Sequence, residues 1–339
     1  MHRYAGEPLR ESCRIAVISH DALGNFVVAT PLLSMLKARY PGSKTTYFAG
    51  ARVSELAEAS ELIDCHRVLP ESGVLSEYEP NLGKFDLIIN LESEQWAAEL
   101  AHRMANPRKD FSTAVVGRCY DKLAQAELPS LNDRVGELFL DPDWTAPDLA
   151  NRHSLLQSGF IGEIFARLVY LTGPIPPYQL SSAEPLIEMP EVLVSMCASR
   201  TDKLWTSVGW EMALKNLRER GLSAGLLGAK PSTQGRFWLG IQTENEMIQR
   251  GWVTDLRGRL TLPEVSGALA HCRLVLTLDN GIMHMAASTQ TPVIGLFRPN
   301  FHRLWAPPVK NLAVLKAGEN ETVSDVSVDR VIEAVNRAL

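Results

Sequence analysis

The chain has 339 residues, a length that fits about two domains of ordinary size. Its 34 lysines and arginines stand against 39 aspartates and glutamates, so the net charge is −5. This balance argues against a nucleic-acid-binding protein but leaves room for a local basic pocket. Hydrophobic residues make up 45 %, and no run approaches the ~20 apolar residues that a membrane span needs.

The five cysteines are widely separated, and none forms a CxxC pair. Neither a disulfide framework nor a thiolate zinc site is therefore expected. The polar start, MHRYAGEPLRESCR, has no apolar signal core. We expect a cytoplasmic protein with reduced cysteines, and peripheral contact with the inner membrane stays open. The cysteines are Cys13, Cys65, Cys119, Cys197 and Cys272.

The first half of the chain alternates strand-like and helix-like runs. Short apolar, β-branched runs predict strands at 14–19, 45–49, 66–69, 86–90 and 113–117. Amphipathic runs predict helices at 26–40, 53–59 and 94–104. This alternation predicts a parallel sheet covered by helices on both faces.

The middle of the chain breaks this rhythm. Residues 128–150 are rich in Pro and Asp and have weak periodicity, whereas 155–171 has the pattern of a helix. Residues 172–185 then concentrate Pro, Gly and Ser, which is typical of a linker.

The alternation restarts after this linker. Strands are predicted at 192–197, 224–227, Leu274–Leu278 and Val293–Phe297, and helices at 208–220, 262–270, 282–289 and 327–339. We therefore expect an α/β protein with two doubly wound domains facing a cleft, because ligands of such sheets bind beyond the carboxyl ends of the strands. The expected layout is 1–172, a linker at 173–190, a second domain at 191–324 and a closing helix at 325–339.

The first of three polar loops follows the first predicted strand and reads SHDALGN (19–25). Gly24 permits a tight turn or a close approach of the backbone to a ligand. Asp21 can act as a general base, or it can cap the following helix. The loop lacks GxGxxG, so it carries no dinucleotide-binding fingerprint.

The second loop follows the first strand of the second half and reads ASRTDKLW (198–205). Ser199, Arg200 and Lys203 offer a hydroxyl, a guanidinium and an ammonium group, which are the donors that a diphosphate needs. Charge-assisted hydrogen bonds of this kind contribute ~1.5–3 kcal/mol each. The alternative is a solvated loop with a local ion pair to Asp202, which would contribute little to stability.

The third loop leads from Leu274–Leu278 through Asp279, Asn280 and Gly281 into an Ala-rich helix. Free backbone N–H groups and the helix dipole make such a helix start an anion site, and a glycine there leaves room for phosphate oxygens. His284 lies in the first turn, where it can donate to a phosphate. The alternative is that Asp279 and Asn280 cap a buried helix and that His284 packs in the core.

The segment Asp141-Pro142-Asp143 matches the DxD pattern of metal-dependent sugar transferases. It lies in a Pro-rich stretch and follows no clear strand, so we expect a surface turn. No other spacing predicts a metal site. We expect no metal and no resident cofactor.

Together, in this order, the three loops resemble glycosyltransferase family 9, the heptosyltransferase family of lipopolysaccharide core assembly. Residues 14–50 resemble its opening strand, A-L-G-D turn and T-P helix, and MCASRTDKLW (196–205) resembles its R-x-D-K-x-W loop. Residues 274–300 resemble its most specific segment, which begins D-[TSN]-G-x-x-H-x-A-A. The resemblance runs from about Arg14 to Val314. It implies a GT-B fold of two Rossmann-like domains, the first binding the acceptor and the second the nucleotide-sugar.

The resemblance also implies roles for individual residues. Ser199 and Lys203 fall where the family binds the donor diphosphate, Asp279 where it contacts the transferred sugar, and Leu262 near the nucleobase pocket. The diphosphate-binding helix start would consist of Asn280, Gly281 and His284.

The sequence departs from the family pattern at two places. The catalytic Asp that follows the Gly of the first turn is Asn25 here, and the Gly-Pro-Thr after the last strand is Arg298-Pro299-Asn300. Asparagine has no titratable group and cannot act as a general base. Asp21, in the same loop, is the replacement candidate, and His20 is the second.

We therefore expect an inverting, metal-independent glycosyltransferase. Its donor would be a nucleotide-sugar, ADP-heptose first by resemblance, and its acceptor a glycan or a small molecule. Lys203 would stabilise the departing diphosphate while Asp21 accepts the acceptor's proton. Two alternatives stay open: a nucleotide-sugar-binding protein without transfer activity, motivated by Asn25, and a GT-B-like sugar-nucleotide epimerase.

Overall fold

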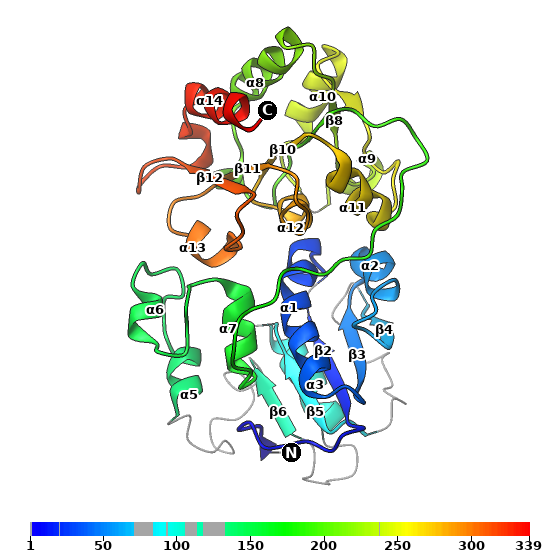
Figure 1. The fold of residues 1–339 in the computed structure, drawn as a ribbon, viewed down its shortest axis with the longest axis vertical. Coiled ribbons are helices and arrows are strands. Elements are labelled where there is room, and N and C mark those ends of the chain that lie inside the picture. Colours follow the sequence, from blue (N-terminus) through cyan, green and yellow to red (C-terminus); the bar gives the residue numbers. More distant parts are fainter. Residues whose placement is uncertain are drawn as a thin grey trace. The chain divides into compact units, whose positions relative to one another are not determined.

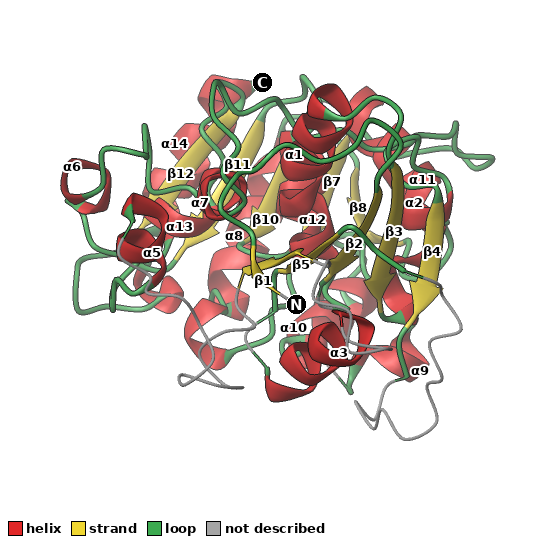
Figure 2. Ribbon diagram, turned by 90° about the horizontal axis from the view of Figure 1, so that it is seen from below, coloured by secondary structure: helices red, strands yellow, loops and turns green. Residues whose placement is uncertain are grey.

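The protein consists of two compact units, Met1–Gln179 and Leu180–Leu339 (Figure 1). The computed structural model describes residues 2–19, 21–70, 84–92, 94–105, 133–236 and 238–339, together with the backbone of 114–117. Each unit contains a six-stranded sheet, and every described strand pairing is parallel. Figure 2 shows these strands flanked by helices, as the alternation predicts.

The first unit has the strand order β1-β6-β5-β2-β3-β4. Its strands are β1 (His2–Arg3), β2 (Arg14–Ile18), β3 (Lys44–Ala49), β4 (Cys65–Val68), β5 (Leu87–Asn90) and β6 (Ala114–Gly117). Its helices are α1 (Leu23–Arg39), η1 (Ala51–Val53), α2 (Ser54–Glu58), α3 (Gln95–Ala105), α5 (Arg134–Phe139), α6 (Leu149–Arg152) and α7 (Ile161–Leu168).

Alternate residues of the first sheet face opposite layers of helices. Ala16 and Ile18 of β2, with Phe48 of β3, join an apolar cluster that includes the buried face of α3. Helix α1 packs beside α7. Strands β2, β3 and β5 are thus buried along most of their length, and their residue patterns set which residues follow at their carboxyl ends.

The second unit has the strand order β12-β11-β10-β7-β8-β9. Its strands are β7 (Val192–Ser195), β8 (Ala224–Leu226), β9 (Thr254–Asp255), β10 (Leu274–Leu278), β11 (Val293–Phe297) and β12 (Leu312–Lys316). Its helices are η3 (Thr201–Lys203), α8 (Ser207–Glu219), α9 (Pro231–Gln234), α10 (Ile241–Gln249), α11 (Leu262–His271), α12 (Gly281–Ala287), α13 (His302–Trp305), η4 (Val323–Asp325) and α14 (Val328–Ala338).

The core of the second unit lies between the sheet and helices α8, α10 and α14. Leu274, Leu276 and Leu278 of β10 point to this side with residues of β7 and β11. The predicted closing helix, α14, packs on α8 and on strands β10 to β12 (Figure 1). Helices α11 and α12 pack against each other, and α12 packs on β10 and β11.

Most predicted strands are found within a residue or two of the expected bounds, and Leu274–Leu278 and Val293–Phe297 match the prediction. The predicted helix at 155–171 is wrong in its first turn and a half, since α7 begins only at Ile161. The buried Glu163 carboxylate accepts hydrogen bonds from the backbone N–H groups of Gln157 and Ser158, which holds that stretch as a turn. Helices α5, α6, α9, α10 and α13 and strands β1, β9 and β12 have no counterpart among the predicted elements.

Candidate functional site

The candidate site of the second unit lies where the order of its strands along the sheet reverses. From β7 the chain proceeds outward to β8 and β9, and then returns to place β10 on the other side of β7. The carboxyl ends of β7 and β10 therefore form the topological switch point, the usual ligand site of a doubly wound sheet. The second and third predicted loops leave from these two strand ends.

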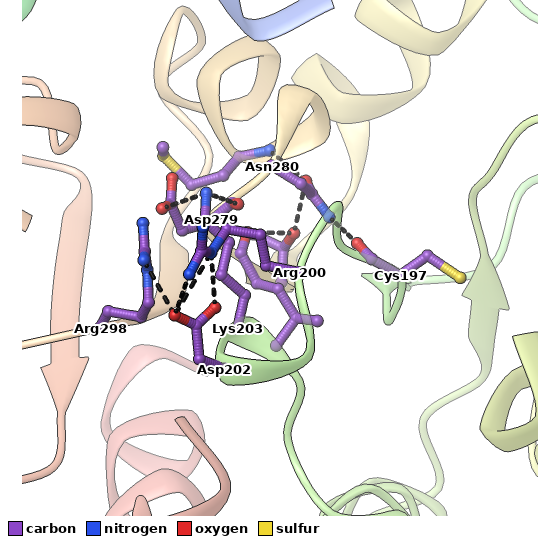
Figure 3. Close-up of polar contacts among 10 residues, drawn as sticks. Cys197, Arg200, Asp202, Lys203, Asp279, Asn280 and Arg298 are labelled. Atoms are coloured by element: carbon purple, nitrogen blue, oxygen red, sulfur yellow. Dashed lines mark hydrogen bonds and ion pairs between the residues drawn. The ribbon is translucent and has the colours of Figure 1, made fainter. Parts of the chain in front are cut away.

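Lys203 and Asp279 form a buried ion pair at this point (Figure 3). Lys203 Nζ lies 2.8 Å from Asp279 Oδ2 and 3.3 Å from the backbone oxygen of Asp279. The two side chains are 14 % and 3 % exposed. Of these two contacts only the one with the backbone oxygen has hydrogen-bond geometry, so the three donors of the ammonium group are not all used within the described residues. The structure thus brings together two residues that are 76 positions apart in the sequence.

Asn280 is the N-cap of α12 and the polar junction of the site. Its Oδ1 accepts hydrogen bonds from the backbone N–H groups of Ile282 and Met283. Its Nδ2 donates to Ser195 Oγ at 3.1 Å and to the backbone oxygen of Cys197 at 2.9 Å. One side chain therefore caps the helix and ties the end of β10 to the end of β7.

The cap limits the predicted anion site at the start of α12, because it uses backbone N–H groups that the prediction left free. Two of its first N–H groups are already taken by Asn280, and the helix is seven residues long. The N–H of Gly281 bonds to no residue in the described part of the chain, and Gly281 is half-buried. The amide that can still meet an anion is thus that of Gly281.

The His284 side chain is buried in the packing of the second unit. His284 is 3 % exposed, and its ring makes an edge contact with Trp305 at a centroid distance of 6.3 Å. Burial lowers the pKa of His284 to about 4, against the opposing charge of Asp279 and with that of Lys203. The ring is therefore neutral at pH 7, which favours the packing interpretation over a charged phosphate contact.

The loop after β7 presents further donors. Ser199 is exposed, and its hydroxyl bonds to no described residue. Arg200 is 63 % exposed and pairs with Asp202 at 3.0 Å, as the alternative interpretation expects. A second arginine, Arg298 after β11, reaches the same carboxylate, with Nη1 at 3.0 Å from Asp202 Oδ2 (Figure 3). The hydrogen bonds and charges of Arg200 and Arg298 outweigh burial and hold the pKa of Asp202 below its usual value.

The five ionised side chains of this cluster carry an excess of one positive charge. Three cations face two carboxylates, so the sum is 3 − 2 = +1, in a chain whose net charge is −5. A site with unmatched positive charge attracts an anion. The members are Arg200, Asp202, Lys203, Asp279 and Arg298. Sequence reasoning missed the part of Arg298, although its departure from the family's Gly was the available signal.

Leu262 occupies the first turn of α11, where Thr261 and Glu264 form a reciprocal capping box. The Thr261 side chain accepts from the Glu264 N–H at 3.3 Å, and the Glu264 carboxylate accepts from the Thr261 N–H at 2.7 Å. Leu262 itself is half-buried, and its backbone position is set by this box. Its predicted place beside a nucleobase stays a prediction.

In the first unit, the corresponding switch point lies between β2 and β5. Asp21 follows β2, but it does not cap α1: the N-cap is Ala22, which makes no side-chain cap bond. Instead the backbone N–H of Arg52 donates to Asp21 Oδ1 at 2.9 Å, and Arg52 Nε pairs with Oδ2. A methyl group on Gly50 would lie 2.2 Å from the Asp21 carboxyl, so only glycine admits this approach. The capping interpretation of Asp21 is therefore wrong.

Gly24 and Asn25 lie in the first turn of α1, and both are half-buried. The Asn25 side chain bonds to no described residue, which leaves its amide available. His20, the second base candidate, lies outside the described residues. The predicted roles of Asp21, Gly24 and Asn25 stay predictions.

The DxD segment is a turn, as expected. Asp141 Oδ1 accepts from the Asp143 N–H, and Asp141 also pairs with His153 and Arg152. Asp143 accepts from the N–H and hydroxyl of Thr145. Both carboxylates are thus engaged in local structure.

The described residues hold no metal cluster, no disulfide and no membrane-spanning helix. They contain no group of three His, Cys, Asp or Glu side chains able to hold a metal ion. Cys13, Cys65, Cys197 and Cys272 are free thiols, and Cys119 lies outside the described part. None of the described helices combines the length and apolarity needed to cross a bilayer.

The sequence and the fold were then compared with known proteins. Residues 176–333 match the family described as Glycosyltransferase family 9 (heptosyltransferase). Lipopolysaccharide heptosyltransferase 3 of Escherichia coli is 24 % identical over 314 residues, covering 87 % of this chain and 86 % of that protein.

Solved structures give the same answer for the fold. A family 9 glycosyltransferase of Veillonella parvula superposes with a TM-score of 0.69 at 16 % identity, covering 98 % of both chains. The E. coli ADP-heptose lipopolysaccharide heptosyltransferase II superposes with a TM-score of 0.67 at 18 % identity, covering 96 % of this chain and 98 % of that one. These matches show a GT-B fold of two parallel-sheet α/β units, and over residues 176–333 the chain is similar to the heptosyltransferases of glycosyltransferase family 9.

Proposed function

We propose that this enzyme transfers a heptose from ADP-heptose to a glycan acceptor of the lipopolysaccharide type, on the cytoplasmic side of the membrane. Transfer would proceed by direct displacement, with inversion at the anomeric carbon and without a metal ion. The names of its relatives support the donor and the acceptor class. The observation that carries the proposal is the Lys203–Asp279 pair at the switch point of the second unit.

Lys203 would stabilise the diphosphate of the leaving nucleotide. Its ammonium group is held in place by Asp279, which preorganises it and leaves N–H donors for a phosphate oxygen. The Ser199 hydroxyl and the Gly281 N–H, neither bonded to a described residue, would add neutral donors. The excess positive charge of the cluster would balance part of the charge that develops on the leaving group.

Asp279 would bind a hydroxyl of the transferred sugar through the carboxylate oxygen that Lys203 does not hold. Asp279 is 3 % exposed, its backbone N–H donates to the backbone oxygen of Leu296 at 3.1 Å, and its carboxylate pairs with Lys203, so both its main chain and its side chain are held. A carboxylate held in this way orients a sugar with little loss of side-chain freedom.

Asp21 would accept the acceptor's proton. Its carboxylate is paired with Arg52, which holds it beside the start of α1. The same pairing, together with Asn25 at the family's base position, favours a second candidate function. In that function the chain binds nucleotide-sugars without transferring them.

Ligand-induced thermal stabilisation tests the donor. ADP, GDP, UDP and their sugars would each be added with Mg²⁺ or with EDTA. A ligand that binds only the folded state at 100 times its Kd stabilises by about 2.7 kcal/mol. We expect ADP and ADP-heptose to raise the Tm, and EDTA to leave this shift unchanged. Stabilisation by another nucleotide alone, or by none, would remove the ADP assignment.

Mass spectrometry of the reaction products tests transfer. With a heptose-accepting lipopolysaccharide core, we expect ADP release and a heptose added to the acceptor, in equal amounts. Tight ADP-heptose binding without product, over a panel of acceptors, would favour the second candidate. Conversion of the donor with no acceptor present would indicate an epimerase.

A further inference from the structure

We propose that Arg298 is a positioning residue of the donor site, and that it acts through Asp202 to fix the short turn that carries Lys203. The inference rests on the proposed function only for the identity of the ligand. The geometry stands on ion pairs that join three strand ends of the second unit.

The turn η3 is held from two sides by consecutive residues. Asp202 pairs with Arg298, at the end of β11, at 3.0 Å, and Lys203 pairs with Asp279, at the end of β10, at 2.8 Å. Figure 3 shows the two pairs side by side at the base of the loop after β7. Because neighbouring residues are anchored to different strands, the turn cannot rotate without breaking one pair.

Arg298 is better placed for this role than Arg200. Its side chain is 11 % exposed, against 63 % for Arg200. Its guanidinium lies 3.7 Å from the centroid of the Phe301 ring, a stacking contact that restricts its rotamers. Arg200 belongs to the same loop as Asp202, so their pair cannot tie this loop to another strand.

The carboxyl-terminal end of the loop after β7 is anchored by Trp205. Trp205, which is 3 % exposed, donates from its indole N–H to the backbone oxygen of Val326 at 2.9 Å. That bond fixes the exit of the loop, whereas the ion pair with Arg298 fixes the turn itself. A glycine at position 298, which the family pattern has, offers no side chain to reach Asp202. The ion pair between Arg298 and Asp202 is thus a feature of this chain's own sequence.

Lysine reactivity tests the proposal without any ligand. Reductive methylation with formaldehyde would be followed peptide by peptide in the wild type, Arg298→Gln, Arg298→Lys and Arg303→Gln. Arg303→Gln is the matched control, because it removes a charge from the same segment and, within the described part of the chain, the Arg303 side chain hydrogen-bonds only to Asn300. The exposed Lys215 serves as the internal reference.

We expect Lys203 to be methylated about fivefold faster in Arg298→Gln, the factor that matches an ion pair of about 1 kcal/mol. Arg298→Lys should restore part of the protection, and Arg303→Gln should leave the rate unchanged. If Arg298→Gln fails to fold, Asp202→Asn removes the same pair and should give the same increase. An unchanged Lys203 rate in a folded variant would overturn the proposal.

ADP binding then separates positioning from direct contact. We expect Arg298→Gln to weaken ADP about fivefold in the wild-type background and to have no effect in a Lys203→Met background. Losses that multiply in the double variant would mean that Arg298 binds the ligand itself, and would overturn the positioning role. If wild-type protein binds no ADP, the donor assignment fails, and the methylation rates alone decide the role of Arg298.

Discussion

The loop after β2 in the first unit and the loops after β7 and β10 in the second occupy equivalent places in two similar sheets, yet they differ in how their polar groups are used. In the second unit Lys203 and Asp279 form an ion pair, and the lysine keeps N–H donors that no described residue uses. In the first unit the Asp21 carboxylate is bound by Arg52 through both oxygens, and Asn25 stands where the family has its base.

This difference indicates that the two halves of the enzyme are constrained differently. On the proposed function, Lys203 and Asp279 would serve the donor. The first unit would bind the acceptor, and there the sequence has Asn25 in place of the family's catalytic Asp.

The largest effect should come from the donor half. Lys203→Ala removes a preorganised cation from the leaving group, so we expect kcat/KM to fall by ~10²–10³. Steady-state kinetics would measure this, with Lys215→Ala as a control on an exposed helix face. Near-normal turnover in Lys203→Ala would mean that the diphosphate is held elsewhere.

The acceptor half should respond in rate rather than in donor affinity. Asp21→Asn removes the proposed base, so we expect kcat to fall by about 10² with little change in the Kd of ADP. Adding Asn25→Asp, which restores a carboxylate at the family's position, should recover part of the loss. Wild-type kcat in Asp21→Asn would remove the base assignment.

Substitutions at Asn280 in the second unit and Asn25 in the first should differ in their effect on the free energy of unfolding. Asn280→Ala loses a helix cap and two hydrogen bonds to β7 and its loop, so the free energy of unfolding should fall by about 2–3 kcal/mol. Asn280→Asp keeps the cap but sets a carboxylate oxygen against the backbone oxygen of Cys197, so its loss should be no smaller. Asn25→Ala, whose side chain bonds to no described residue, should change stability by less than about 0.5 kcal/mol. Urea denaturation would rank the three, and equal losses at both positions would contradict the contrast.

The smallest effect concerns pH. Burial lowers the pKa of His284 to about 4, below the value of about 6.5 for an unfolded chain, so the unfolded state binds more protons between these values. Stability should therefore rise with pH across this window, and be lost as the pH falls from about 6.5 to about 4. Between pH 7.5 and 5 the loss should be at most about 2 kcal/mol. A folded His284→Leu variant should lose less over that range; an identical slope would contradict this assignment.

Much of the fold could be predicted because buried strands of a parallel sheet are continuous apolar runs. LVLTL and VIGLF leave no doubt about period or length, and Asn280-Gly281 marks the turn that follows. The pairing of Lys203 with Asp279 could be expected only as proximity, since both residues follow strands whose carboxyl ends meet.

The errors have physical causes that local pattern does not show. The helix at 155–171 starts late because a buried carboxylate, Glu163, binds the backbone of the preceding turn. The role of Arg52 as the partner of Asp21 depends on a close approach to Gly50, which is a tertiary contact. The part of Arg298 likewise depends on the adjacency of β11 and β10, which no spacing in the sequence reveals.

Each unit encloses an apolar cluster of its own, built around β2 and α3 in one case and around β10, α8 and α14 in the other. Cooperative melting follows the residues that share a core, so heating should produce two transitions in a calorimeter rather than one. A nucleotide that binds only the second unit would then shift one peak and leave the other in place. The thermogram would thus report which half a ligand occupies before any turnover is measured.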